Sequence, residues 1–260
     1  MSRIQKIFQQ KEQEVLNVYF TAGYPALNDT LTIMNALAGS GADIIEIGMP
    51  YSDPLADGPV IQESSSKALE NGMTIHTLFL QLAGFRKNPL LENTGVILMG
   101  YMNPVLQYGF ENFCKEAAAV GVDALILPDL PEYEYENEFG SIIKKYGLDF
   151  IFLVTPETSE TRIRKLDELS SGFLYAVSSS ATTGGATDFD AVELYLQRLQ
   201  KMKLTNPVLV GFGIKDKDSF RSACKYANGA IIGSAYIKAL SGTADINSAT
   251  KAFLNPIVNL

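Results

Sequence analysis

One short motif recurs along the chain and marks the joints between its predicted elements. In this motif a glycine, a small residue and an aspartate precede an apolar run, as at residues 41–45, 121–126 and 147–152, and residues 229–232 form a shortened relative. Each glycine follows a helix-like stretch, where it can take the positive φ that ends a helix, and each apolar run has the length of a buried strand. We therefore interpret the motif as a helix-to-strand joint.

Eight apolar runs are predicted as strands. They are Leu16–Thr21, Ile44–Gly48, Val96–Tyr101, Asp123–Leu127, Phe150–Val154, Phe173–Val177, Val208–Phe212 and Ala230–Gly233. The stretches between them are helix-like, among them Thr30–Ala38, Thr74–Phe85, Phe110–Ala119, Glu134–Tyr146, Glu160–Leu169, Ala191–Met202 and Lys217–Tyr226. The runs are continuously apolar, as parallel strands covered on both faces require.

This alternation predicts an α/β fold, a (β/α)8 TIM barrel, with residues 1–260 as a single domain and a short helix before the first strand. An open, doubly wound parallel sheet is the alternative that alternation by itself leaves open.

The composition of the chain excludes several classes of partner and site. The 29 acidic residues outnumber the 21 basic ones, so we expect no nucleic-acid partner. The chain has no run of 18 apolar residues and no signal-peptide core at its start, which predicts a cytoplasmic protein without a membrane partner. Cys114 and Cys224 have no C-x-x-C partner and His76 is the single histidine, so no metal site is predicted and His76 is interpreted as a solvated or capping residue.

Two of the places where a barrel could hold its site carry carboxylates. Glu46 lies inside the second strand run, where a carboxylate is costly unless it is functional or paired, and a structural ion pair is the alternative. The next loop, Met49–Pro59, contains Asp53 and Asp57 and can present a second carboxylate to a ligand, or it is an ordinary irregular connection.

Two further places suit an anion. The loop Ser178–Thr187 is polar and uncharged and could close over an anion, with a disordered surface loop as the alternative. Glycines follow the last two strands, and a helix predicted to begin at Ser234 would add its N-terminus to a phosphate cradle. Together these places predict a small phosphorylated ligand that is handled by acid–base chemistry.

The residues that carry these features resemble the alpha chains of tryptophan synthase. Residues 46–62 read EIGMPYSDPLADGPVIQ and match the family pattern E-x-G-x-P-[FY]-S-D-P-x-A-D-G-P-x-I-Q. Shorter matches follow in family order at Thr21–Pro25, Tyr101–Pro104, Leu127–Pro131, Thr183–Gly184, Gly211–Ile214 and Gly233–Ala235.

The resemblance implies cleavage of indole-3-glycerol phosphate to indole and glyceraldehyde 3-phosphate, with no cofactor on this chain. It assigns acid–base catalysis to Glu46 and the indole N–H to Asp57. It places the phosphate at Gly184, Gly213, Gly233 and Ser234. Contacts to the indole or glycerol part are expected from Tyr19, Met99, Ile126, Tyr175, Thr183, Phe212 and Ile232, although core packing explains the apolar members equally well.

One segment departs from the family. Many members read S-R-x-G-x-T-G after the sixth strand, whereas residues 178–184 read SSSATTG and lack both the arginine and the first glycine. Thr183 and Gly184 are retained, so the departure bears on loop closure and on its coupling to a partner rather than on phosphate binding.

The resemblance also implies a partner, the tryptophan synthase beta subunit, in an alpha2beta2 complex. Pyridoxal phosphate would belong to that subunit, which would receive indole through a tunnel for L-tryptophan synthesis. The surface expected to face it comprises Pro50–Asp57, Asn103, Pro104 and Pro128–Pro131. Two alternatives share these residues, a stand-alone lyase and a non-catalytic activator of a beta subunit, while the loop pattern disfavours another phosphosugar barrel such as an isomerase.

Overall fold

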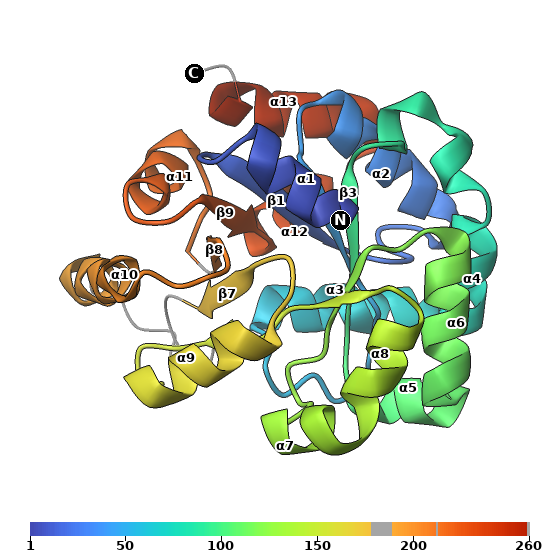
Figure 1. The fold of residues 1–260 in the computed structure, drawn as a ribbon. Helices are drawn as coiled ribbons and strands as arrows, with labels where there is room; N and C mark the ends of the chain where they lie inside the picture. Colours follow the sequence, from blue (N-terminus) through green and yellow to red (C-terminus); the bar gives the residue numbers. More distant parts are fainter. Residues whose placement is uncertain (178–188, 212, 259–260) are drawn as a thin grey trace.

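The computed structural model describes residues 1–177, 189–211 and 213–258 of the chain. Its parallel strands form one curled sheet at the centre of the molecule (Figure 1) in the order β5-β4-β3-β2-β1-β9-β8-β7-β6. The strands are β1 Val15–Thr21, β2 Ile44–Gly48, β3 Gly95–Met99, β4 Ala124–Ile126, β5 Asp149–Phe150, β6 Leu153–Val154, β7 Leu174–Val177, β8 Val208–Gly211 and β9 Gly229–Ile232.

The two ends of this sheet belong to a single stretch of chain. Only Ile151 and Phe152 separate β5 from β6. The Ile151 N–H donates to the Leu125 carbonyl at 3.1 Å on one side, and the Phe152 carbonyl accepts from the Tyr175 N–H at 3.0 Å on the other. Residues 149–154 therefore act as one strand that joins β4 to β7. The ring is closed, which confirms the predicted (β/α)8 barrel and excludes the open doubly wound sheet.

Helices surround the barrel (Figure 1), and every helix-like stretch expected from the sequence contains helix. Six appear as α2 Thr30–Gly39, α4 Ile75–Leu82, α6 Phe110–Val120, α9 Glu160–Leu169, α10 Phe189–Met202 and α11 Lys217–Cys224. The seventh is a continuous helical run of three parts, α7 Glu132–Glu134, the π-helical turn η4 Tyr135–Phe139 and α8 Gly140–Lys145.

Two further helices were expected from the sequence, α1 Arg3–Gln10 before the first strand and α12 Ser234–Leu240 at the predicted start. The remaining helical segments are α3 Pro59–Glu70, α5 Met102–Tyr108, α13 Ile246–Val258 and the short 3-10 turns η1 Leu27–Asp29, η2 Phe85–Lys87 and η3 Pro89–Leu91. Within the described residues, no helix has the length and apolar character that a bilayer crossing requires.

The repeated joint has the expected backbone and a second role for its aspartate. Gly41, Gly121 and Gly147 have φ values of 95°, 98° and 70°, which confirms the predicted end of the preceding helix. For the shortened relative the expectation is wrong, because Gly229 is the first residue of β9 and has no positive φ. The Asp43 carboxylate accepts from the Leu16 N–H at 2.8 Å, and the Asp123 carboxylate accepts from the Val96 N–H at the same distance. Each of these aspartates thus extends the parallel ladder by one bond to the neighbouring strand.

Helix α1 covers the amino-terminal end of the barrel (Figure 1). Its Ile4, Ile7 and Phe8 are buried and join the cluster of side chains that fills the barrel interior. Two ion pairs fix this end of the chain, one between Arg3 and Asp123 and one between Lys11 and Asp43 at 2.6 Å. The amino-terminal end is therefore packed, and the opposite end is left for a site.

The joint at Asp123 generates a stability prediction. Its buried carboxylate pairs with Arg3 and with Arg86 at 2.6 Å while it accepts the Val96 N–H. We expect Asp123→Asn to lower the free energy of unfolding by about 3 kcal/mol, because two guanidinium groups would lose their counter-charge in a partly desolvated place. Urea denaturation followed by circular dichroism measures this loss.

An exposed ion pair serves as the control. Lys67 and Glu70 are 3.2 Å apart on α3 and both side chains are more than half exposed. Glu70→Gln should change the free energy of unfolding by less than about 0.5 kcal/mol, since exposed pairs contribute little. Equal losses in the two variants would contradict the structural role given to Asp123.

Candidate active site

A cavity of about 460 Å³ opens at the carboxyl ends of the strands. Eight of the residues predicted for the site line it together, although they come from distant parts of the chain: Tyr19, Glu46, Asp57, Met99, Tyr175, Gly213, Gly233 and Ser234. Because the carboxyl ends of parallel strands meet at one end of a barrel, the fold brings these side chains into one place.

Glu46 occupies β2 with 1% of its surface exposed. The Asn17 side-chain amide donates to Glu46 Oε2 at 2.7 Å. Burial, and to a smaller extent the nearby charge of Asp57, raises the pKa of Glu46 to about 8, while the bond from Asn17 acts in the opposite direction. Within the described part of the chain the ion pairs leave Glu46 out, so the structural ion-pair alternative has no support.

Asp57 lies in the loop that follows β2, and the loop is anchored at this point. The Tyr101 hydroxyl donates to Asp57 Oδ2 at 3.0 Å and accepts from the Ala56 N–H at 3.1 Å. Burial raises the pKa of Asp57 to about 6, and the bond from Tyr101 opposes the rise. No role was predicted for Tyr101. Its position two residues beyond β3 and its place in the family match Tyr101–Pro104 are the signals that could have suggested one.

Two buried tyrosines, Tyr19 and Tyr175, line the same cavity, and each depends on a glycine at the end of a neighbouring strand. A Cβ atom at Gly48 would lie 2.0 Å from the Tyr19 hydroxyl, and one at Gly211 would lie 2.2 Å from the Tyr175 hydroxyl. Burial raises the pKa of both phenols well above the usual value, and the charges of Asp57 and Glu46 add to the effect. Both phenol hydroxyl groups therefore remain protonated and neutral.

The cavity also has a basic part. Lys215 and Lys238 line it together with Gly213, Gly233 and Ser234. Both lysines were missed from the sequence, although the spacing of Ser234 and Lys238 places them on the same face of α12. Positive charge beside glycine backbone and a serine hydroxyl suits an anionic group such as a phosphate.

Two of the remaining predicted contacts, Ile126 and Ile232, do not line this cavity. Ile126 is buried in the barrel interior, whereas Ile232 packs in the layer between sheet and helices. Ile231 lines the cavity in place of Ile232, because successive side chains of a strand point to opposite faces. Thr183, Gly184 and Phe212, and the predicted lid Ser178–Thr187, lie outside the described residues.

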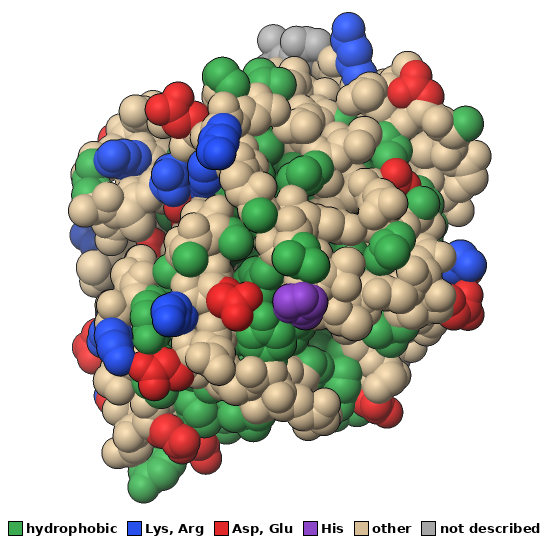
Figure 2. All heavy atoms as spheres, turned by 90° about the vertical axis from the view of Figure 1, so that its right-hand side faces the viewer, with side chains coloured by type: hydrophobic (Ala, Val, Ile, Leu, Met, Phe, Trp, Pro, Cys, Tyr) green, Lys and Arg blue, Asp and Glu red, His purple; other side chains and the backbone are tan. Residues whose placement is uncertain are grey.

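His76 is exposed near the start of α4, as expected for a solvated residue, and is seen at the surface in Figure 2. It borders a surface hollow of about 570 Å³ and is absent from the lining of the cavity that contains Glu46. In the described ranges no group of three or more His, Cys, Asp and Glu side chains could hold a metal ion.

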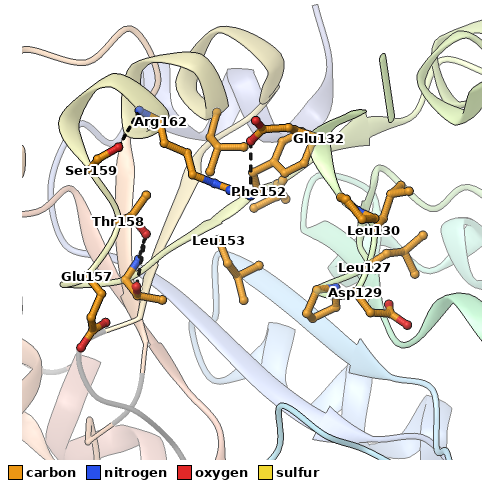
Figure 3. Close-up of a pocket in the computed structure, with 15 residues that line it drawn as sticks. Leu127, Asp129, Leu130, Glu132, Phe152, Leu153, Glu157, Thr158, Ser159 and Arg162 are labelled. Atoms are coloured by element: carbon orange, nitrogen blue, oxygen red, sulfur yellow. Dashed lines mark hydrogen bonds and ion pairs between the residues drawn. The ribbon is translucent and has the colours of Figure 1, made fainter. Parts of the chain in front are cut away.

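A second, larger hollow of about 690 Å³ is lined by residues that follow β4 and by residues in and around β6. Figure 3 shows Leu127, Asp129 and Leu130 on one side of it and Thr158 and Ser159 on the other. Above them the Arg162 guanidinium reaches toward the Glu132 carboxylate, 3.3 Å away. Because Pro128–Pro131 borders this hollow, it lies on the surface that was expected to face a partner.

The bond between Tyr101 and Asp57 yields a prediction. A hydroxyl donor favours the ionised carboxylate, so its removal in Tyr101→Phe should raise the pKa of Asp57 above about 6. Asp57 would then be protonated over a wider part of the neutral pH range. Carbon-13 NMR of labelled aspartate carboxyl groups, recorded as a function of pH, measures the midpoint.

Tyr51→Phe is the matched control. The Tyr51 ring lies 5.5 Å from the Tyr101 ring, and its hydroxyl accepts from the Asn103 amide rather than contacting Asp57. This variant removes a neighbouring phenol hydroxyl and should leave the Asp57 midpoint in place. An unshifted midpoint in Tyr101→Phe would show that Tyr101 does not tune Asp57.

The sequence profile of the family "Tryptophan synthase alpha chain" matches residues 5–256. The tryptophan synthase alpha chain of Flavobacterium johnsoniae is 53% identical over 93% of this chain and 94% of the relative. That of Parabacteroides distasonis is 49% identical over 94% of both chains.

Solved structures agree over nearly the whole fold. The tryptophan synthase subunit alpha of Legionella pneumophila superposes with a TM-score of 0.88 at 33% identity, over 99% of this chain and 97% of the other. A chain of the Mycobacterium tuberculosis tryptophan synthase gives a TM-score of 0.84 at 30% identity, with coverage of 99% and 98%. This protein therefore belongs to the tryptophan synthase alpha chain family.

Proposed function

We propose that this chain is a cytoplasmic lyase that cleaves indole-3-glycerol phosphate to indole and glyceraldehyde 3-phosphate. The observation that carries the proposal is a single cavity that contains two carboxylates of different pKa, Glu46 and Asp57, together with Lys215, Lys238 and Ser234. The carboxylates supply acid–base chemistry and the basic part suits the phosphate.

The pKa values divide the work between the two carboxylates. With a pKa of about 8, Glu46 is mostly protonated at neutral pH, whereas Asp57 with a pKa of about 6 is mostly ionised. When the environments of two acid groups give them different pKa values in this way, the group with the higher pKa serves as the proton donor and the other provides a negative charge. We therefore assign Glu46 the proton transfers and Asp57 the indole N–H.

The reaction then balances with these two groups alone. Glu46 gives its proton to carbon 3 of the indole ring, and Asp57 stabilises the positive charge that develops on the ring nitrogen. The carboxylate of Glu46 next takes the proton of the glycerol hydroxyl group. The carbon–carbon bond breaks, its electron pair restores the aromatic ring, and the aldehyde of glyceraldehyde 3-phosphate forms. The ring accepts the electrons, so the scheme needs no cofactor on this chain.

The other lining residues suit the remaining parts of the substrate. Lys215, Lys238 and the Ser234 hydroxyl would hold the phosphate with Gly213 and Gly233, where the close approach of backbone N–H groups is unhindered by a side chain. The apolar side chains of the cavity, Ile61, Met99, Ile231 and Phe253, would exclude water from the indole ring.

We further propose that a tryptophan synthase beta subunit, which would carry pyridoxal phosphate, binds over the mouth of the barrel in an alpha2beta2 complex. Large apolar side chains are exposed on or beside the three segments expected to face it. Leu55, 87% exposed, lies in the loop Pro50–Asp57, while Leu106, 50% exposed, and Tyr133, 70% exposed, lie two residues after Pro104 and Pro131 respectively. Exposed apolar groups that gather on one face are typical of a protein–protein interface.

Substitution of Glu46 tests the catalytic assignment. Glu46→Gln should lower turnover at least about a hundredfold, because the new side chain cannot exchange a proton. Substrate binding should be retained, since the variant keeps the size of the side chain and an acceptor for Asn17. Indole release measures turnover, and calorimetry with indole-3-glycerol phosphate measures binding.

Glu63→Gln is the control for this variant. Glu63 is an exposed carboxylate on α3 outside the cavity, so its loss should leave turnover near that of the unchanged chain. Near-normal turnover in Glu46→Gln would overturn the role of Glu46. If the chain released no indole, alone or with a beta subunit, the non-catalytic activator would be favoured, and equal rates alone and in complex would favour the stand-alone lyase.

The partner surface gives a separate prediction. Leu106→Asp places a charge on the exposed face of α5 and should raise the Kd for a tryptophan synthase beta chain at least about tenfold. Sedimentation of the mixed chains measures the complex. Leu194→Asp on α10, where the leucine is 66% exposed, is the control, because α10 is remote from α5 (Figure 1). Identical affinities for both variants would exclude this surface.

A further inference from the structure

Asn17 is a polar side chain in the interior of the barrel. It has no exposed surface and lies on β1 between Val15 and Tyr19, on the same face of the strand because side chains alternate. Val15 belongs to the interior cluster that is otherwise built from apolar and aromatic side chains. An aliphatic residue at this position would continue that cluster, so the amide needs a separate explanation.

Among the described residues, the amide nitrogen of Asn17 has a hydrogen-bond partner and its amide oxygen has none. Its Nδ2 donates to Glu46 Oε2 at 2.7 Å, and its Oδ1 is buried without a hydrogen-bond partner. An unpaired buried amide oxygen costs free energy that an aliphatic side chain would avoid. This destabilising amide lies next to the carboxylate that the proposed reaction uses. A polar side chain that lowers stability beside a reactive group is typical of a residue with a functional role.

Resting on the acid–base role proposed for Glu46, we propose that Asn17 is the positioning residue for that carboxylate. Its amide holds Oε2, which fixes the orientation of the Glu46 side chain from the neighbouring strand. Oε1 is then the oxygen that gives the proton to carbon 3 of the ring and receives one from the glycerol hydroxyl. The chemistry stays with Glu46, and Asn17 sets the geometry in which it occurs.

The bond also has an electrostatic effect. A donor to the carboxylate favours its ionised form and opposes burial and the charge of Asp57, which both raise the pKa of Glu46. The other titratable groups around Glu46 are Tyr19 on β1 and Tyr175 on β7, both neutral phenols, and Lys215 and Lys238 line the same cavity. Loss of Asn17 should therefore raise the pKa of Glu46.

Asn17→Leu tests the proposal, because leucine is close to asparagine in size and has no donor. The midpoint of the alkaline limb of the kcat profile, where Glu46 loses its proton, should rise by about one pH unit. Turnover at neutral pH should fall about tenfold, since the carboxylate loses its fixed orientation. The midpoint of urea unfolding should stay unchanged or rise, because an unpaired amide has been removed.

A double variant separates positioning from a general disturbance. In the Glu46→Gln background, Asn17→Leu should lower turnover no further, because the group that Asn17 positions is already inactive. Val15→Ala is the matched control, since it opens a space on the same face of β1 away from Glu46. It should reduce stability and leave the pH midpoint in place.

The outcomes distinguish this inference from the proposed function. Carbon-13 NMR titration of the Glu46 carboxyl reads its pKa without any turnover, so the inference stands or falls even if the chain proves inactive. An unshifted midpoint in Asn17→Leu, with Glu46→Gln inactive, would overturn the role of Asn17 and leave the lyase intact. Full activity of Glu46→Gln would instead refute the proposed chemistry. If Asn17→Leu does not fold, Asn17→Ala removes the same donor in a smaller side chain.

Discussion

Closure of the strand ring is the constraint on which the site depends. Residues 149–154 pair with β4 on one side and with β7 on the other, so the sheet has no free edge in the part of the chain that the structure describes. Only in a closed ring do Glu46 from β2 and Tyr175 from β7 face the same space. The strands are continuously apolar, so both faces of the ring are buried. The same apolar side chains surround the two carboxylates with a medium of low polarity.

That medium explains why the carboxylates differ from ordinary surface acids. Burial is the largest cause of the raised pKa of both Glu46 and Asp57. Each carboxylate accepts one hydrogen bond that opposes the rise, from Asn17 and from Tyr101 respectively. The more deeply buried of the two has the higher pKa, which suits a proton donor beside a fixed negative charge.

The sequence was most informative where a pattern is local. The eight strand runs and the glycine joints depend on neighbouring residues, and the structure bears out the strand runs and the joints at Gly41, Gly121 and Gly147. Ile232 and Ile231 show where this reasoning ends, because a shift of one residue along a strand exchanges the inside of the barrel for the outside. Asn17, Tyr101 and Lys215 reach the site across strands or loops, and no spacing in the chain reports such contacts. Helices α3, α5 and α13 also went unpredicted. Helix α3 follows the irregular loop of residues 49–58, whereas α5 begins almost directly after β3.

The packing of α1 beneath the barrel has a consequence for exchange. Because Ile4, Ile7 and Phe8 fill that end, the barrel is closed at its amino-terminal end. Whatever enters the cavity and whatever leaves it must cross the same rim, where Leu55 is exposed. A partner bound at the rim would therefore control both the entry of substrate and the release of product. The order of these two events would depend on the rim rather than on the carboxylates.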